Sequence, residues 1–225
     1  MKDYLKRDII GWDTENWSRA IPFWEKLGQL KQRDNKCLEL GAYGGGLSLW
    51  LALNKNRVIC SNLEIPDANT KKIHHQYNCL SYIAYEAIDA TNIPYADHFD
   101  FITFKSILGG IPGVDGQQVK IKTINQIHTS LKPGGKLLFA ENLSASIFHK
   151  ILRYWFGTKN WNYLKLSDMD VVFSSFSDVK YTTVGFFGCF GRNESQRIFL
   201  GKLDKFFDWM IPRKCRYIII GIATK

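Results

Sequence analysis

The sequence has no apolar run long enough to cross a bilayer. The longest run near the C-terminal end, residues 217–223, falls far short of the ~20 residues that a membrane helix requires. Residues 1–10, MKDYLKRDII, mix three basic and two acidic groups and lack the apolar core of a secretory signal peptide. These absences predict a cytoplasmic protein, with action at the inner membrane surface as the alternative location.

Patterned cysteines and histidines are also missing. The five cysteines are odd in number and form no Cys-x-x-Cys pair, which predicts reduced thiols rather than a disulfide framework. His74 and His75 are adjacent, so on a helix they point to different faces, and His98 and His128 have no patterned carboxylate nearby. The sequence therefore predicts no metal site.

Long runs of one charge are absent as well, because no basic run exceeds two residues, and this argues against a nucleic-acid-binding tail. The net charge is nevertheless +9, and residues 150–225 hold 13 Lys/Arg against 6 Asp/Glu. Such a basic segment attracts phosphorylated substrates, lipid headgroups or nucleic acid, although an ordinary basic surface has the same composition.

What is present is an alternation of strand-like and helix-like segments in a chain of 225 residues that is 45% hydrophobic. This pattern predicts a single α/β domain: a seven-stranded, mostly parallel sheet with helices on both faces and an antiparallel last strand. The expected strands are 36–40, 57–62, 83–88, 99–104, 136–140, 179–187 and 216–223. The expected helices are 12–30 with a break near Pro22, 47–54, 67–77, 117–131, 144–156, one beginning at Ser167, and 194–210.

A glycine-rich turn joins the first strand to the next helix in CLELGAYGGGLSLWLAL, residues 37–53. Glycine lets a ligand approach the backbone, and the helix start offers free N–H groups. The GxGxxG dinucleotide spacing is broken by Tyr43, and no Lys follows as in a phosphate-binding P-loop. Glu39 before the turn suits a ligand that carries an amine; a purely structural turn is the alternative.

Polar side chains close the second and third strands. Asn62 lies 23 residues after Glu39, Glu64 follows it, and Asp89 ends the third strand. Because the carboxyl ends of parallel strands meet at one edge of the sheet, this arrangement fits a nucleoside laid across the three strand tips.

The segments LELGAYGGG, VICSNLE, AIDATNIPYADHFDFITFKS and LKPGGKLLFAEN, within residues 36–142, resemble class I S-adenosylmethionine-dependent methyltransferases. Several flanking segments further resemble bacterial members that modify surface polysaccharides or related small molecules. The resemblance implies a Rossmann-like fold with S-adenosyl-L-methionine as cofactor. It divides the single domain, 1–225, into an N-terminal helical lid (1–35), a cofactor-binding core (36–142) and a substrate-side part (143–225).

The resemblance also implies roles by position. Glu39 and the backbone of the turn hold the methionine part, Asn62 meets the ribose, and Leu63, Asp89 and the Ala90 N–H contact adenine. Lys105 lines the mouth where the methyl group is transferred. The turn residues concerned are Gly41, Ala42, Tyr43, Gly44 and Gly45. The sequence departs from the family pattern at two positions, with Tyr43 in place of a glycine and Asn62 in place of the acid that binds the ribose. These departures predict weaker cofactor binding, unless Glu64 takes the role of the missing acid.

Methylation of a hydroxyl needs a base. The candidates follow the fifth strand: Glu141 at its tip and His149 on the next helix, with Arg153 one turn on to bind an anionic group. Trp155 lies in an aromatic cluster suited to stacking against sugar rings. The sequence thus predicts methyl transfer to a small-molecule or glycan-type acceptor, anionic or lipid-linked, through a hydroxyl.

Three alternatives remain open. The basic C-terminal third permits an RNA methyltransferase, although the sequence lacks an Asn/Asp-Pro-Pro motif after strand four and an appended RNA-binding module. The altered Tyr43 and Asn62 permit a degenerate fold that binds without catalysis. The basic, aromatic segment around Phe206, Phe207 and Trp209 permits peripheral membrane contact with a lipid-linked acceptor. The sequence does not determine the oligomeric state.

Overall fold

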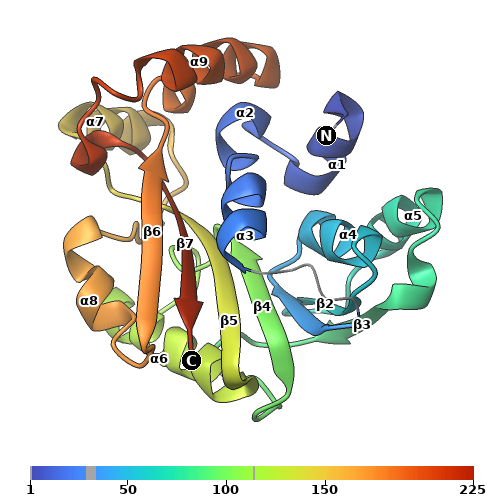
Figure 1. Cartoon of the computed structure of the whole chain (residues 1–225). Coiled ribbons are helices and arrows are strands. Elements are labelled where there is room, and N and C mark those ends of the chain that lie inside the picture. The colour runs from blue at the N-terminus through green and yellow to red at the C-terminus, as the bar shows by residue number, and fades with distance from the viewer. Residues whose placement is uncertain (1, 29–33, 114) are drawn as a thin grey trace.

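A seven-stranded sheet forms the centre of the computed structural model, which describes residues 2–28, 34–113 and 115–225 (Figure 1). Its strand order is β3-β2-β1-β4-β5-β7-β6. The strands are β1 (Lys36–Leu40), β2 (Arg57–Asn62), β3 (Ile83–Ala87), β4 (Phe99–Lys105), β5 (Leu131–Asn142), β6 (Asp178–Val184) and β7 (Ile218–Thr224).

Strands β1 to β5 run parallel, and β7 lies antiparallel between β5 and β6. The predicted α/β architecture with an antiparallel last strand is therefore confirmed. From β1 the chain winds outward in one direction to β3 and then returns to β4 on the other side of β1. In open α/β sheets, ligands bind beyond the carboxyl ends of the strands at such a reversal.

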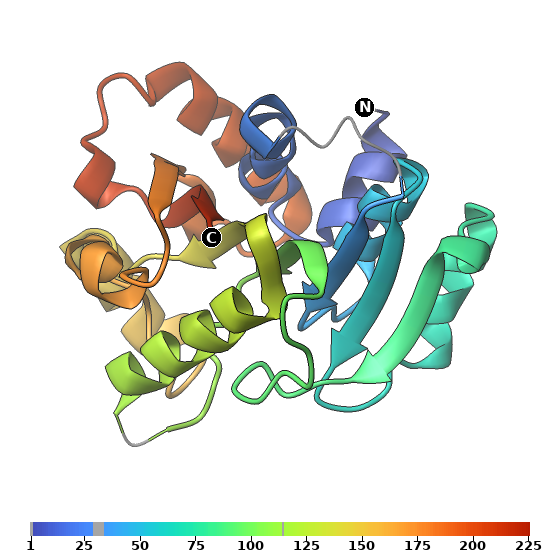
Figure 2. The ribbon, with the colours of Figure 1, turned by 60° about the horizontal axis from the view of Figure 1, so that its bottom comes forward.

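Helices cover both faces of the sheet (Figure 2). Helices α3 and α4 pack on one face together with α1 and α2, and α6 and α8 pack on the other. The helices are α1 (Asp3–Ile10), α2 (Thr14–Trp17), α3 (Ala20–Gly28), α4 (Gly46–Leu53), α5 (Ala68–Gln76), α6 (Gly116–Ser130), α7 (Ile147–Phe156), α8 (Met169–Val172) and α9 (Glu194–Phe207).

The two faces are separated by the alternation of side chains along each strand. Cys37 and Leu138 contribute to the core under α3 and α4, whereas their neighbours Leu38 and Leu137 contribute to the core under α6 and α8. The central strands β1 and β4 are buried on both faces, as is usual for parallel sheets, whereas the edge strand β6 (DVKYTTV) keeps exposed polar residues.

The N-terminal segment differs from the predicted helix at residues 12–30 with a break near Pro22. It forms three helices, α1, α2 and α3, and Pro22 lies in the first turn of α3, where its missing N–H costs little. Residues 29 and 30 lie outside the described residues. Trp24 of α3 is fully buried and its indole N–H donates to the Gly221 carbonyl at 3.0 Å, which fastens α3 to β7.

Several other boundaries differ. Strand β5 begins at Leu131 instead of residue 136, because Pro133 to Gly135 continue the strand through an irregular register beside β4. Helix α7 begins at Ile147, and β6 ends at Val184. Ser167 does not cap a helix: it lies in a 3-10 turn, and its hydroxyl donates to Asp168.

The fold predicts a steric constraint at Gly221, which pairs with Phe139 across β5 and β7. A Cβ at Gly221 would lie 2.2 Å from Cζ of the buried Phe139 ring. We expect Gly221→Ala to lower the free energy of unfolding by about 1–3 kcal/mol in urea titrations, because the methyl group overpacks the core.

A smaller ring should relieve this clash, so Phe139→Leu combined with Gly221→Ala should be less destabilising than the sum of the two single changes. Gly44→Ala serves as the control, since a Cβ there meets no atom within 4 Å. Strict additivity of the two substitutions would contradict the proposed contact.

Candidate active site

A cavity of about 1390 Å³ opens beyond the carboxyl ends of β1, β2 and β4. One part, which we call the glycine-turn half, is lined by Gly41, Tyr43, Asn62, Leu63, Glu64, Asp89 and Ala90. The other part, which we call the arginine half, is lined by Trp12, Asp13, Trp17, Arg153, Trp161, Tyr163, Arg192, Arg197 and Tyr217. Lys105 and Ser106, at the end of β4, also line the cavity.

The carboxylate of Glu39 fixes the start of α4. It is buried and accepts hydrogen bonds from the Leu47 N–H at 3.2 Å and the Ser48 N–H at 2.7 Å. Burial raises the pKa of Glu39 to about 7, and the bonds from Ser48 and Leu47 act in the opposite direction. Glu39 does not line the cavity, and in this structure its carboxylate caps the start of α4. Its contact with the amine of a ligand stays a prediction.

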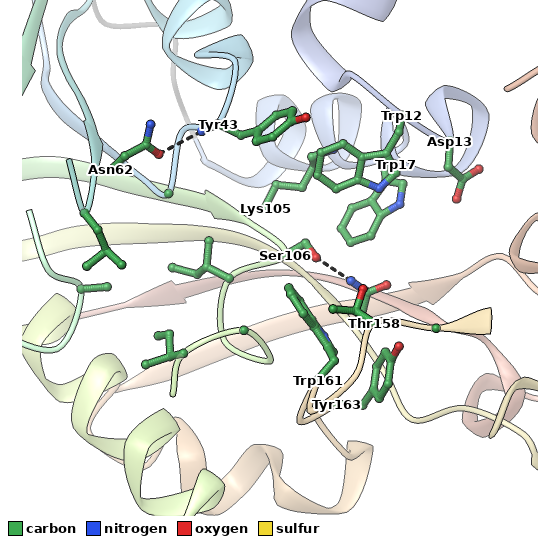
Figure 3. Close-up of a pocket in the computed structure, with 18 of the residues that line it drawn as sticks. Trp12, Asp13, Trp17, Tyr43, Asn62, Lys105, Ser106, Thr158, Trp161 and Tyr163 are labelled. Atoms are coloured by element: carbon green, nitrogen blue, oxygen red, sulfur yellow. Dashed lines mark hydrogen bonds between the residues drawn. The ribbon is translucent and has the colours of Figure 1, made fainter. Parts of the chain in front are cut away.

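The glycine turn brings backbone close to the cavity at Gly41, where a Cβ would lie 2.5 Å from Cγ2 of Ile107. Tyr43 takes a left-handed conformation with φ of 50°, and its ring is largely exposed. Its N–H donates to Oδ1 of Asn62 at 3.0 Å (Figure 3). The two departures from the family pattern therefore contact each other.

The remaining turn residues support the loop from behind and do not line the cavity. The Ala42 N–H donates to the Ser61 carbonyl at 2.9 Å. Gly45 is left-handed, with φ of 74°, and its carbonyl lies 2.8 Å from Nε2 of His74. Gly44 precedes it with open space around its Cα.

Three residues predicted to contact a nucleobase do line the glycine-turn half. Leu63 is 73% exposed although it is a large apolar side chain. Asp89 and Ala90 follow β3, and Oδ1 of Asp89 accepts the Thr91 N–H at 2.7 Å. This bond orients the carboxylate at the strand end, beside the apolar surface of Leu63.

Lys105 lies against the N-terminal segment. Its ammonium is 3.1 Å from the centroid of the Trp12 ring and 5.1 Å from that of Trp17, and it donates to the Ile10 carbonyl. Burial lowers the pKa of Lys105 to about 7, although nearby carboxylates, led by Asp13, favour the charged form. Lys105 is among the residues that line the cavity, and its predicted place at the mouth where the methyl group is transferred stays a prediction.

The two predicted bases lie behind the cavity wall. Glu141 is fully buried and accepts the N–H groups of Leu108 and Asn142 at 2.7 and 2.8 Å. His149 is fully buried between the Ser146 hydroxyl at 2.7 Å and the Phe186 carbonyl at 2.9 Å. Neither lines the cavity, so their positions do not support the predicted role in direct proton removal.

Asp13, a carboxylate that was not predicted from the sequence as a site residue, lines the cavity. Asp13 is 4% exposed, and in the described part of the chain its Oδ1 has no hydrogen-bond partner. Its Oδ2 accepts the Tyr217 hydroxyl proton, and Asn16 donates to that hydroxyl oxygen at 3.0 Å. Burial raises the pKa of Asp13 to about 7, against the opposing effects of the Tyr217 hydrogen bond and the Arg197 charge.

The backbone at Asp13 is held in an unusual conformation. Its φ is 45°, in the left-handed region that non-glycine residues rarely adopt. The Asp13 and Thr14 N–H groups donate to the Glu194 carboxylate at 2.8 and 2.9 Å. Glu194, the first residue of α9, thus fixes the loop that presents Asp13 to the cavity.

The arginine half carries three guanidinium groups. Arg153 donates to the Leu143 carbonyl at 2.5 Å, and its guanidinium lies 4.0 Å from the centroid of the Tyr163 ring. Arg192 lies 3.6 Å from the centroid of the Phe156 ring. Within residues 2–28, 34–113 and 115–225, no carboxylate forms an ion pair with Arg153, Arg192 or Arg197.

Aromatic side chains form opposite walls of this half. Trp12 and Trp17 lie on one side, and Trp161 and Tyr163 on the other (Figure 3). Trp155, predicted as a substrate contact, is 71% exposed and does not line the cavity, because it lies on the outer side of α7.

The described residues contain no group of three potential metal ligands. Among the same residues, no helix has the length and apolarity needed to cross a membrane.

Comparison with known proteins identifies the class. The family model for the methyltransferase domain matches residues 12–182, which is more than half of the chain. The chain therefore belongs to this methyltransferase family. The predicted resemblance to class I S-adenosylmethionine-dependent methyltransferases is confirmed at the level of family and fold. No match was found among curated protein sequences.

Solved structures share the fold at low sequence identity. A protein from Galdieria sulphuraria assigned as a sarcosine dimethylglycine methyltransferase is 14% identical, with a TM-score of 0.63 over 92% of this chain and 85% of that one. Phosphoethanolamine N-methyltransferase 2 of Haemonchus contortus, with phosphomonomethylethanolamine and S-adenosylhomocysteine, is 16% identical, with a TM-score of 0.65. That match covers 93% of this chain but only 52% of the nematode protein.

The [4+2]-cyclase SpnF is another structural neighbour, 13% identical, with a TM-score of 0.60 over 94% of this chain and 80% of the cyclase. The same fold thus carries enzymes with different names and reactions, so the acceptor must be inferred from the cavity itself.

The buried ammonium of Lys105 generates a prediction about stability. Its pKa falls from 10.5 in the unfolded chain to about 7 in the folded protein, so the charge destabilises the fold increasingly as the pH falls between these values. We expect Lys105→Met to raise the free energy of unfolding by about 1–3 kcal/mol at about pH 6 and by less at about pH 9. The lost cation–π contact with Trp12 offsets part of this gain.

Urea titrations at the two pH values measure the effect. Lys202→Met, at an exposed position of α9, is the matched control and should show no such pH dependence. An equal change in stability at both pH values for Lys105→Met would contradict the lowered pKa.

Proposed function

We propose that the protein transfers a methyl group from S-adenosylmethionine to a small acceptor that carries a hydroxyl and an anionic group. The observation that carries this proposal is the division of one cavity into a glycine-turn half and an arginine half, with the buried Asp13 carboxylate facing the latter. When bound, the cofactor supplies an electrophilic methyl group on a sulfonium.

The residues of the glycine-turn half suit an aminoacyl nucleoside. The close approach of backbone at Gly41 leaves room only for a residue without a Cβ. Asn62 and Glu64 offer oxygen atoms for ribose hydroxyls, while exposed Leu63 offers an apolar surface for adenine and Asp89 an acceptor for its amino group. We propose that these residues hold the cofactor, and that Glu39 acts through the shape of the turn instead of by contact.

The residues of the arginine half suit an anionic ring. Guanidinium groups bind carboxylates and phosphates with paired hydrogen bonds, and the three here have no carboxylate partner in the described chain. The opposing aromatic walls can stack on a sugar face, and the buried Trp161 indole N–H has no partner among the described residues. A glycan-type acceptor with an acidic substituent fits these features.

Asp13 is the base that the geometry favours. Its free Oδ1 can accept the proton of an acceptor hydroxyl, while the Tyr217 hydroxyl holds Oδ2. A raised pKa brings this carboxylate closer to the basicity needed at neutral pH, because proton transfer is most effective when the pKa lies near the working pH. Trp12 and Trp17, from the same N-terminal segment, line this side of the cavity.

An amine is the second candidate acceptor group. The names of two structural neighbours denote amine substrates that also carry an acidic group. A carboxylate such as Asp13 would then pair with the substrate ammonium, and the arginines would bind the anionic end. Competition against the true acceptor by zwitterions of the glycine betaine type, which carry a quaternary ammonium and a carboxylate, would favour an amine acceptor. Competition by a hydroxyl compound that has no ammonium group would favour a hydroxyl acceptor.

Cofactor binding is tested at Asn62. Asn62→Asp keeps an oxygen for the Tyr43 N–H and adds a charged acceptor for ribose hydroxyls, so we expect about threefold to tenfold tighter binding of S-adenosylhomocysteine. Asn62→Ala should weaken binding by about tenfold. Isothermal titration calorimetry measures both, and Asn54→Asp, outside the cavity at the end of α4, is the control. Absence of binding heat and of a thermal shift in the unaltered protein would refute the cofactor site and favour a degenerate fold.

The base is tested at Asp13. Because the carboxyl is protonated below its pKa of about 7, kcat/KM for the acceptor should fall about tenfold per pH unit below that value. Asp13→Asn should abolish this fall of kcat/KM at low pH and should lower kcat by about 10²–10⁴-fold. The affinity for S-adenosylhomocysteine should stay unchanged.

The acceptor for this assay comes from a screen of acidic sugars and sugar phosphates with labelled cofactor. Asp8→Asn is the matched control, since Asp8 lies on α1 outside the cavity, where its carboxylate accepts a hydrogen bond from the Tyr77 hydroxyl. An Asp13→Asn enzyme with the original pH profile would show that another group removes the proton.

A further inference from the structure

The outer face of α7 is an exposed apolar stripe. We define the α7 stripe as Ile147, Phe148, Ile151, Tyr154 and Trp155, whose side chains are 53% to 83% exposed. Contiguous exposed apolar surface of this kind marks an interaction site in a soluble protein, because leaving it in water is unfavourable.

Helical periodicity explains why these five residues share a face. At 100° per residue they fall within a sector of about 120°, whereas His149, Leu152, Arg153 and Phe156 fall on the opposite side. That inner side holds the buried His149 and supplies three lining residues of the cavity. The same helix therefore contacts the acceptor region with one face and solvent with the other.

Polar contacts hold α7 in place from the inside. His149 lies 2.9 Å from the Phe186 carbonyl, and Arg153 donates to the Leu143 carbonyl at 2.5 Å. The apolar outer residues are thus not needed to attach the helix to the protein. This leaves the α7 stripe without a described partner inside the fold.

The chain segment that carries the stripe has charge of one sign. Residues 142–167 contain no Asp or Glu and four Lys/Arg. Lys150 and Lys159 are exposed within or just beyond α7, and the Arg192 guanidinium lies over the Phe156 ring at its C-terminal end. An apolar, aromatic helix face flanked by positive charge is complementary to a surface that is apolar inside and anionic outside.

We propose that the α7 stripe docks the protein on an anionic phospholipid bilayer, with α7 lying in the plane of the interface. Ile147, Phe148 and Ile151 enter the acyl region, Tyr154 and Trp155 occupy the headgroup level, and the lysines contact lipid phosphates. The opposite face of the same helix lines the arginine half of the cavity, so docking brings that half close to the membrane surface. Binding to lipid is independent of the methyl-transfer reaction.

Vesicle sedimentation tests this proposal without cofactor or acceptor. The protein should sediment with phosphatidylcholine vesicles that contain phosphatidylglycerol, and much less with pure phosphatidylcholine. The triple variant Phe148→Gln, Ile151→Gln, Trp155→Gln should bind the anionic vesicles at least tenfold more weakly. Its control is Val171→Gln on α8, which also replaces an exposed apolar residue and should bind as the unaltered protein does.

A second pair of variants tests the charge. Lys150→Glu with Lys159→Glu should abolish the preference for phosphatidylglycerol, whereas Lys122→Glu, at an exposed position of α6, should preserve it. All variants should keep the unaltered thermal unfolding midpoint, because the substituted side chains are exposed. That measurement shows that any loss of lipid binding is not a loss of folding.

Three results would overturn the proposal. The first would be a failure of the unaltered protein to bind anionic vesicles. The second would be binding of these vesicles by the triple variant as strongly as by the unaltered protein. The third would be a dimer of the unaltered protein in analytical ultracentrifugation together with a monomeric triple variant, because this would show that a second copy of the chain covers the α7 stripe.

Discussion

The shape of the cavity depends first on a buried carboxylate. Glu39, at the end of β1, accepts the Leu47 and Ser48 N–H groups at the start of α4 and so closes the glycine turn from behind. The turn must then pass between the strand end and the helix start with little room for side chains, as Gly41 shows beside Ile107. A strand, a carboxylate and a helix start together make a backbone-lined wall, and the strand tips of β2 and β3 extend it.

The arginine half has a different origin, because it is assembled from segments far apart in the chain. Asp13 accepts a hydrogen bond from Tyr217, which lies 204 positions further along the chain, and Glu194 on α9 holds the loop that carries Asp13. The Asp204 carboxylate accepts the Phe186, Phe187 and Gly188 N–H groups and the Asn16 amide, which ties the N-terminal segment to the loop after β6. The arginine half of the cavity therefore depends on a small number of buried hydrogen bonds between segments that are remote in the sequence.

This difference explains what could be predicted from the sequence. The architecture, and the presence of Asn62 and Asp89 in the cavity, follow from local rules: strand, turn, then a polar residue at a strand end. Leu63 and Lys105 also line the cavity, but they were expected there only because the chain resembles class I methyltransferases. Asp13 could not be found in this way, because its burial results from contacts with residues near position 200. Its only local signal is its position directly after Trp12 in a lid-like segment. Glu141 and His149 lie behind the cavity wall for a related reason. Periodicity places residues on a strand tip or a helix face, but the phase that decides which way they point is set by packing, here against Leu108 and Phe186.

The position of β7 has a consequence for how the chain acquires its fold during synthesis. In the described sheet β6 pairs with β7, and β7 alone joins it to β5. While the ribosome is still making α9, β6 therefore has no neighbour to hydrogen-bond with, although the five parallel strands can already be complete. The glycine-turn half of the cavity can thus form on the emerging polypeptide, whereas the arginine half waits for Tyr217 to leave the exit tunnel.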